Sequence, residues 1–462
     1  MPARARRKVA GELETSQHLA PRLELGHLLG RPPDPGPIAI GRLLSGDLAD
    51  TTYPVILGAT REGEPVTLVS AQVLSRPTVV SRRLRRPIQR EILSADWAYA
   101  GAHLPHESDR TFRDATLELT DLLIWAGATG FDERYERSHR DVTVSLTLPD
   151  PSAVELPIGK LTLAHGWRTT GDLRRSRGIE KSVGFRVETS EPFDVPTLLT
   201  RFGNPLRYLL TFATDRPNEI ERLTVKTMRY DQVRGTDVLV EYPRIGDPQM
   251  LPDSIGIDFL FDARTLGDRF AAVMTAWFEL YDRIRPALSL LFGPRYRPGT
   301  FTDNHFLNVV AAAEGYHRAA VRNEVLPRAE HKVRLASVIA AAPDEHRPWL
   351  KERLAHSNEP TLRERLVELH RRANGVVSGV LGSADAFADP VVGARNALTH
   401  RGTPHKAKEI PGRELFRLTE QIAFLLTACL MLDLGFVELE VVAATRRSRR
   451  FRILTEVFGP DE

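Results

Sequence analysis

Residues 266–292 read LGDRFAAVMTAWFELYDRIRPALSLLF, and this stretch decides the fold class of the second half of the chain. Its apolar side chains recur at steps of three and four, which is the spacing of one face of a helix. Gly293 and Pro294 follow directly and are expected to end that helix. We therefore predict a long helix whose buried face carries Phe270, Val273, Met274, Trp277, Leu280, Tyr281, Ile284, Leu288 and Leu291.

The chain downstream continues in the same helical pattern. The longest apolar run, IAFLLTACLML at residues 422–432, has eleven residues, whereas a membrane span needs about 20. It is predicted to lie in a buried helix, and its apolar excess over one helical stripe favours a homodimer formed through the helical part. We predict helices at 304–325, 334–342, 348–356, 361–380, 389–401 and 412–434, which form a bundle.

The chain before residue 242 has the pattern of β structure, with short apolar or alternating runs between Gly, Pro, Asp and Asn. In VTVSLTL, residues 142–148, apolar side chains alternate with Thr and Ser, which predicts one face in a core and the other toward water. One helix is expected at 195–211, bent or broken by Pro205. Strands are expected at 37–44, 53–58, 66–73, 142–148, 160–163, 183–189 and 223–228.

These two patterns predict an α+β multidomain protein. A chain of 462 residues exceeds the size of one typical core. We expect a β-rich N-terminal domain at residues 1–245 and an all-α helical bundle at residues 246–462, joined near the loop-like stretch 245–253.

Composition narrows the class of function. The 63 Lys and Arg against 60 Asp and Glu give a net charge of +3, which permits nucleic-acid binding without demonstrating it. Cys429 is the only cysteine, so a disulfide within the chain and a cysteine-based zinc site are excluded. No secretory pattern follows the basic start, and a cytoplasmic location is expected. The sequence has no GxxxxGK[ST], HExxH or GxSxG motif, and we expect no metal, no cofactor and no membrane contact.

The stretch VVGARNALTHRGTPHK, residues 391–406, carries the candidate chemistry. On the predicted helix 389–401, Asn396 and His400 are four apart and share a face, while Arg395 lies about 140° from His400. Histidine exchanges a proton near neutral pH, and the fork of an arginine holds a phosphate and its developing charge. RNA supplies its own nucleophile, the 2′-hydroxyl, so no metal-activated water is needed. The stripe expected to face the bundle is Val391, Ala394 and Leu398.

The segment from Arg395 to His400 resembles the R-x(4–6)-H motif of the HEPN superfamily, including the polar Asn396 after the arginine. The stretch NHFLNVVAAAEGYHR, residues 304–318, resembles the Glu-x-Tyr-His helix of the HEPN domains at the C-terminus of ApeA-type anti-phage proteins. Those proteins also carry a long β-rich N-terminal domain.

This resemblance implies a metal-independent endoribonuclease that leaves a 2′,3′-cyclic phosphate and acts as a dimer with a composite site. It also implies bacterial defence, with tRNA or other cellular RNA cut after an unknown phage-derived trigger. The β-rich domain would then be the sensor, and a fragment starting near Ile255 is expected to fold and cleave RNA alone.

Glu314 and His317 form a second group, three apart on one helical face. A carboxylate there would orient Arg395 or His400 through a charge-assisted hydrogen bond. The alternative is that the two residues bind each other or pack the bundle.

Arginine clusters occur at residues 81–90, 173–181 and 445–452. Such clusters neutralise phosphates without reading sequence, or they form an ordinary salt-bridged surface. The last cluster follows the bundle and is the favoured RNA contact, through Arg446, Arg447, Arg449 and Arg450.

Two rival interpretations remain open at this point. In the first, the bundle is a non-catalytic HEPN-like nucleic-acid-binding or dimerisation protein. In the second, the N-terminal domain is the enzyme and the bundle only dimerises, although residues 1–242 contain no recognisable catalytic cluster.

Overall fold

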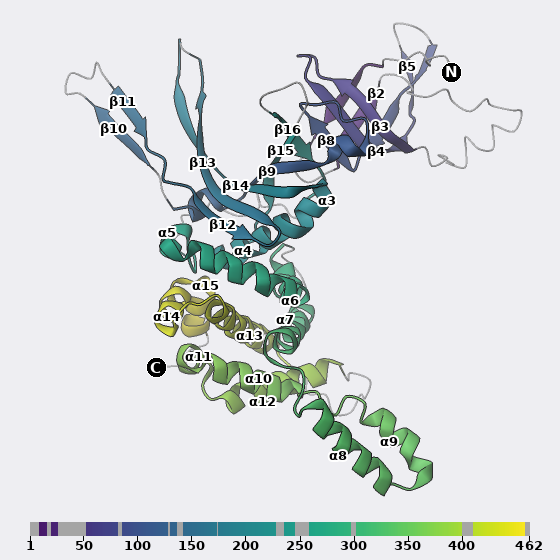
Figure 1. Cartoon of the computed structure of the whole chain (residues 1–462), viewed down its shortest axis with the longest axis vertical. Helices are drawn as coiled ribbons and strands as arrows, with labels where there is room; N and C mark the ends of the chain where they lie inside the picture. The colour runs from purple at the N-terminus through teal and green to yellow at the C-terminus, as the bar shows by residue number, and fades with distance from the viewer. Residues whose placement is uncertain are drawn as a thin grey trace, which may run out of the picture. The chain divides into compact units, whose positions relative to one another are not determined.

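The structure is a computed structural model of the 462-residue chain. It describes residues 9–15, 20–25, 52–81, 86–127, 130–135, 142–172, 174–227, 235–244, 258–296, 302–399 and 410–457. The predicted fold class is confirmed, because the N-terminal part is rich in strands and the C-terminal part is helical (Figure 1). The chain forms two compact units. Unit 1 comprises Met1–Leu123, Gly130–Asn204 and Glu219–Leu251, and unit 2 comprises Ile124–Thr129, Pro205–Asn218 and Pro252–Glu462.

Unit 1 is built on a large antiparallel sheet. Among the described residues it has 12 strands, in the order β1-β2-β7-β4-β8-β16-β15-β9-β14-β13-β12, with β3 paired to β4. The strands expected at 53–58, 66–73, 160–163, 183–189 and 223–228 lie in this sheet, and the one expected at 37–44 lies outside the described residues. The strands are β1 (Gly11–Glu14), β2 (Arg22–Leu25), β3 (Thr52–Ala59), β4 (Pro65–Ser75), β7 (Glu91–Ser94), β8 (Trp97–Ala100), β9 (Phe112–Leu119), β12 (Ser152–Leu156), β13 (Gly159–Thr170), β14 (Gly178–Phe193), β15 (Ile220–Thr227) and β16 (Thr236–Glu241).

The core of unit 1 lies on one face of the central strands. Phe185, Leu117 and Leu223 are cross-strand neighbours on β14, β9 and β15, and all three are fully buried. The helix α3 (Val195–Leu198) continues into the π-helical turn Leu199–Gly203, whose last residue lies beside this row. A Cβ added to Gly203 would lie 3.6 Å from Leu117, so the segment approaches the sheet closely at that point.

Two short hairpins accompany the sheet, β5 (Thr78–Ser81) with β6 (Arg86–Gln89) and β10 (Phe131–Tyr135) with β11 (Val142–Leu146). The prediction that one face of residues 142–148 lies in a core is wrong. Within the described part of the chain β11 pairs only with β10, and Val144 is 43% exposed. Alternation alone does not bury a strand when no second layer covers its apolar side.

Unit 2 is a helical bundle. The predicted helix 361–380 is in fact two helices, because the chain breaks at Ala373 before the weak helix formers Asn374 and Gly375. The helices that belong to it in whole or in part are α2 (Leu122–Trp125), α4 (Asn204–Thr214), α5 (Ala263–Leu266), α6 (Phe270–Tyr296), α7 (Thr302–Tyr316), α8 (Arg328–Ala341), α9 (Arg347–Arg353), α10 (Leu362–Arg372), α11 (Asn374–Leu381), α12 (Ala384–Thr399), α13 (Gly412–Asp433), α14 (Glu438–Arg447) and α15 (Arg449–Arg452).

The helix α13 is the centre of unit 2. It contacts α6, α7, α10, α11, α12 and α14. It is long and apolar enough to cross a membrane, but 83% of its most apolar window is buried among the other helices, as in the core helix of a bundle. The predicted buried helix is therefore confirmed. The apolar side chains beyond one helical stripe are buried by other helices of the same chain, so they give no argument for a dimer.

The helix α6 continues past the point where it was expected to end. Gly293 and Pro294 lie inside it, and the last turn reaches Tyr296. Arg295 donates a hydrogen bond to the carbonyl oxygen of Thr211 at 2.9 Å, and the Tyr296 hydroxyl donates one to that of Asn218 at 2.9 Å. These contacts to residues 205–218 stabilise a turn that the local sequence disfavours.

The helix α4 belongs to unit 2 although it comes from the first half of the chain. Residues 205–214 are all buried. Phe212 stacks on Trp277 of α6 with ring centroids 6.0 Å apart, and the Trp277 indole donates to the carbonyl oxygen of Pro205 at 2.9 Å. A fragment starting near Ile255 lacks this helix, and the apolar face around Trp277 would be exposed to water. Its independent folding stays a prediction, and this packing argues against it.

Candidate functional site

The candidate motif lies at the C-terminal end of α12. Val391 is fully buried and Ala394 is 4% exposed, so this stripe faces the bundle as predicted, with Leu398 half-buried beside it. Arg395 is half-buried and Asn396 is exposed. His400 lies outside the described residues.

Arg395 is held by its neighbour in the motif. Its Nη1 donates a hydrogen bond to Oδ1 of Asn396 at 3.2 Å, and the Thr399 hydroxyl donates to the Arg395 carbonyl oxygen at 2.9 Å. Among the described residues no carboxylate pairs with Arg395. With respect to the described part of the chain, the guanidinium is available for an anion. The amide nitrogen of Asn396 takes no part in the contact with Arg395 and can donate to a ligand.

The N-terminal half of α12 is fixed against α10. Arg363 donates to Asp385 and to Asp389 at 2.7 Å each. His370 is 1% exposed, and its Nε2 lies 3.0 Å from the Gly382 carbonyl oxygen. A carbonyl only accepts, so Nε2 of His370 carries the proton. These contacts join α10 to the N-terminal half of α12 and to the residue Gly382 that precedes it.

Glu314 and His317 lie on α7 and on the π-helical turn His317–Val321 that continues it. His317 is fully buried: its Nε2 lies 2.9 Å from Oε2 of Glu368, and its Nδ1 lies 3.1 Å from Nη1 of Arg365. Glu314 is half-buried and acts electrostatically on Arg365. The structure therefore places this pair with α10, and the expected contact with Arg395 is not among the interactions of the described residues.

The protonation state of His317 follows from its partners. An arginine only donates, so Nδ1 accepts from Arg365 and Nε2 donates to Glu368. Burial lowers the pKa of His317 below its usual value, although the hydrogen bond to Glu368 acts in the opposite direction. The imidazole is thus a neutral link between α7 and α10, and in this environment it is suited to packing.

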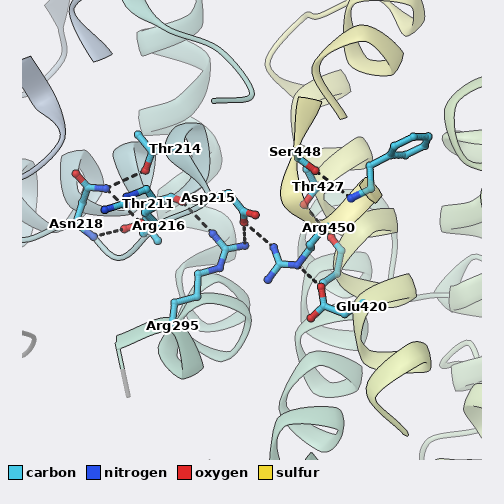
Figure 2. Close-up of polar contacts among 12 residues, drawn as sticks. Thr211, Thr214, Asp215, Arg216, Asn218, Arg295, Glu420, Thr427, Ser448 and Arg450 are labelled. Atoms are coloured by element: carbon cyan, nitrogen blue, oxygen red, sulfur yellow. Dashed lines mark hydrogen bonds and ion pairs between the residues drawn. The ribbon is translucent and has the colours of Figure 1, made fainter. Parts of the chain in front are cut away.

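The C-terminal arginines divide into two groups. Arg446 and Arg449 are exposed. Arg447 donates to the Leu260 carbonyl oxygen at 3.3 Å. Arg450 lies between two carboxylates, with Asp215 at 2.8 Å and Glu420 at 2.7 Å, as Figure 2 shows.

The expectation that Arg450 contacts RNA is therefore corrected. Its side chain is 14% exposed, and Asp215 also accepts from Arg295 at 2.8 Å. Arg450 donates through Nε to Glu420 and through Nη1 to Asp215, and both partners belong to unit 2. Arg446, Arg447 and Arg449 stay predictions as RNA contacts.

Sequence reasoning missed the polar residues of α10, above all Arg365. That side chain is buried at 2% exposure, and it donates to the Pro360 carbonyl oxygen, to Asn323 and to His317. A capping box of Thr361 and Glu364 marks the start of the helix in the sequence. It shows where α10 begins but not which of its charged residues face α7. In the part of the chain that the structure describes, no group of three His, Cys, Asp or Glu is placed to hold a metal ion.

Comparison with protein families matches both parts of the chain. The family described as ApeA N-terminal domain 1 matches residues 2–277, more than half of the chain, and the family described as Apea-like HEPN matches residues 307–439. The chain belongs to the ApeA family. No curated protein and no solved structure gave a match.

In this ApeA-type protein the HEPN match begins within α7 and ends within α14. It contains Arg395, Asn396 and His400, together with Glu314, His317 and the polar residues of α10. The resemblance noted in the sequence is therefore confirmed for the family and for the order of its two parts.

Proposed function

We propose that this ApeA-type protein is a metal-independent endoribonuclease whose site contains Arg395, Asn396 and His400. The observation that carries the proposal is the guanidinium of Arg395, which lies near the end of a firmly supported helix without a carboxylate partner among the described residues. That helix lies inside the HEPN match. An arginine left unpaired in this way is suited to bind a phosphate.

The proposed reaction is transesterification within RNA. The ribose 2′-oxygen attacks the adjacent phosphorus, the bond from phosphorus to the 5′-oxygen breaks, and the products are a 2′,3′-cyclic phosphate and a 5′-hydroxyl. Arg395 holds the phosphate and its developing charge, and Asn396 positions it. One proton leaves the 2′-oxygen and one reaches the 5′-oxygen, and His400 transfers a proton in one of these steps.

The biological setting is part of the same proposal. The HEPN unit would act in anti-phage defence on tRNA or other cellular RNA in the cytoplasm. Two copies of the chain would join their helical parts into a composite site. The β-rich unit 1 would respond to a phage-derived trigger. The family assignment supports the role in anti-phage defence.

Cleavage of bulk tRNA by the purified full-length protein in EDTA tests the proposal. We expect the wild type to cut, His400→Ala to lose about 100-fold or more in rate because proton transfer is removed, and Arg395→Ala to lose about 100-fold because a charged donor is removed. Asn396→Ala should be milder, since an amide carries no charge to the phosphate.

His346→Ala and Arg283→Ala are matched controls, because both residues are exposed and lie on other helical segments of unit 2. Both should cut like the wild type. Full activity in His400→Ala, or inhibition of the wild type by EDTA, would contradict the mechanism. RNA binding without cleavage under every condition would instead support the non-catalytic alternative.

A further inference from the structure

The β13–β14 hairpin extends beyond the sheet from which it starts (Figure 1). Its two strands pair from Lys160 with Glu188 to Thr170 with Gly178. The next strand, β9, meets β14 only from Phe185 onward. Residues 165–170 and 178–183 therefore form a two-stranded ribbon that, among the described residues, has no further strand beside it.

One face of this ribbon carries an exposed tryptophan. On β13 the side chains of Leu161 and Leu163 are buried, and every second residue continues on the same face. Trp167 is the third residue in that series after Leu161, and it is 61% exposed because the core ends before it. Its cross-strand neighbour is Lys181. A large flat ring thus stands in water next to a cation.

The loop at the end of the ribbon is basic. The Asp172 carboxylate accepts the backbone N–H groups of Arg174 at 2.7 Å and Arg175 at 2.9 Å, which fixes the turn. Both arginine side chains are exposed, and no carboxylate of a described residue pairs with them. Arg177 donates to the Thr169 hydroxyl at 2.7 Å.

That hydrogen bond brings the Arg177 guanidinium to the ribbon face that carries Trp167. Thr169 lies on this face because it is two residues from Trp167 on the same strand. The opposite face holds the ion pair of Arg168 with Glu180 at 2.6 Å. Residues 165–183 contain five basic and two acidic side chains. Among the described residues, the three arginines without a carboxylate partner, Arg174, Arg175 and Arg177, therefore lie in the loop, and Arg177 reaches the ribbon face that carries Trp167.

We propose that this ribbon binds single-stranded nucleic acid, with a base stacked on Trp167 and phosphates held by Arg174, Arg175 and Arg177. An aromatic side chain beside a row of cations is the arrangement that binds unpaired strands, since every base has a flat face and every phosphate a negative charge. A duplex hides its base faces and offers Trp167 no partner of that kind. The inference stands apart from cleavage, because none of these residues belongs to the candidate motif on α12.

Fluorescence anisotropy with the full-length protein tests the ribbon. The probes are a short labelled single strand of 2′-O-methyl RNA, which has no 2′-hydroxyl to react, a single-stranded DNA of the same sequence, and the matching duplex. We expect both single strands to bind more tightly than the duplex. Trp167→Ala should weaken the single strands by about 5- to 100-fold, and Trp167→Phe should keep most of the affinity.

Two variants serve as matched controls. Trp349→Ala removes another exposed tryptophan, at 59% exposure, and the double variant Arg61→Ala with Arg113→Ala removes two exposed arginines of unit 1. Neither should change binding, whereas Arg174→Ala with Arg175→Ala should reduce the slope of log affinity against log salt by about 1.4. Unchanged affinity in Trp167→Ala, equal affinity for the duplex, or no binding by the wild type would overturn the proposal.

Discussion

At the residue scale, Arg450 and Arg395 carry the same guanidinium but have different neighbours. Arg450 is paired with Asp215 and Glu420, whereas Arg395 contacts only the amide of Asn396 among the described side chains. Asp215 lies 235 residues before Arg450 in the chain. No local sequence pattern predicts a partner that far away along the chain. The sequence therefore indicated which residues could bind a phosphate, but not which of them were already occupied.

This difference predicts opposite effects of two substitutions on stability. Arg450→Ala leaves the carboxylates of Asp215 and Glu420, which are 17% and 8% exposed, without one of their cations. We expect a loss of about 3 kcal/mol in the free energy of unfolding, measured by urea denaturation. Arg449→Ala, at an exposed neighbouring position, should change it by less than about 0.5 kcal/mol. Equal stability of the two variants would show that the buried network contributes nothing.

The buried His317 predicts a pH dependence. Burial lowers its pKa in the folded state, so the folded protein binds fewer protons there than the unfolded chain. The free energy of unfolding should therefore fall as the pH drops through about 6.5, the value of the unfolded histidine. His317→Gln should reduce that loss, because an amide can donate to Glu368 and accept from Arg365 without titrating.

Urea midpoints measured above and below that pH give the comparison. His346→Gln, at an exposed position, serves as the control and should leave the wild-type dependence unchanged. If His317→Gln loses as much stability as the wild type on acidification, the titration of His317 is not the cause.

At the element scale, a helix or strand could be predicted from the sequence where its structure depends on neighbouring residues, and not where it depends on distant parts of the chain. Residues 412–434 were predicted as one helix, and α13 spans Gly412–Asp433, because a long apolar pattern needs no knowledge of distant partners. The strand expected at residues 142–148 had the right pattern but no layer to cover it. The last turn of α6 contains Gly293 and Pro294, which predict a helix end, and it is stabilised by contacts to Thr211 and Asn218.

The helix α4 allows a prediction at this scale. Phe212 is 1% exposed and packs against the rings of Trp277, Phe261 and Phe292. Phe212→Ala should lower the free energy of unfolding of the helical unit by about 3–5 kcal/mol through the cavity it leaves. The same change at Phe416, which is 38% exposed, should cost clearly less.

Tryptophan fluorescence during urea denaturation reports this directly, because Trp277 lies in the affected core. A similar small loss in both variants would mean that α4 is a dispensable cover. In that case a fragment starting near Ile255 would again be expected to fold.

At the scale of the whole molecule, the sequence predicted a β-rich part followed by a helical part, and both are present. It did not predict that residues 205–218 return to the helical unit, because membership of a unit depends on packing between distant segments. This return gives unit 2 a component encoded in the first half of the chain. A fragment of the second half alone would lack residues 205–218 of unit 2, and cleavage should therefore be measured on the full-length protein.

The chemical nature of the RNA ends tests the central claim most directly. Total RNA is incubated in EDTA with the purified wild type and with His400→Ala, and the ends of the fragments are identified. Attack by the 2′-oxygen predicts new 2′,3′-cyclic phosphates matched by new 5′-hydroxyls, and none of these ends above background in His400→Ala. Fragments that carry 5′-phosphates and 3′-hydroxyls, or the same cyclic ends produced at full rate by His400→Ala, would contradict the account.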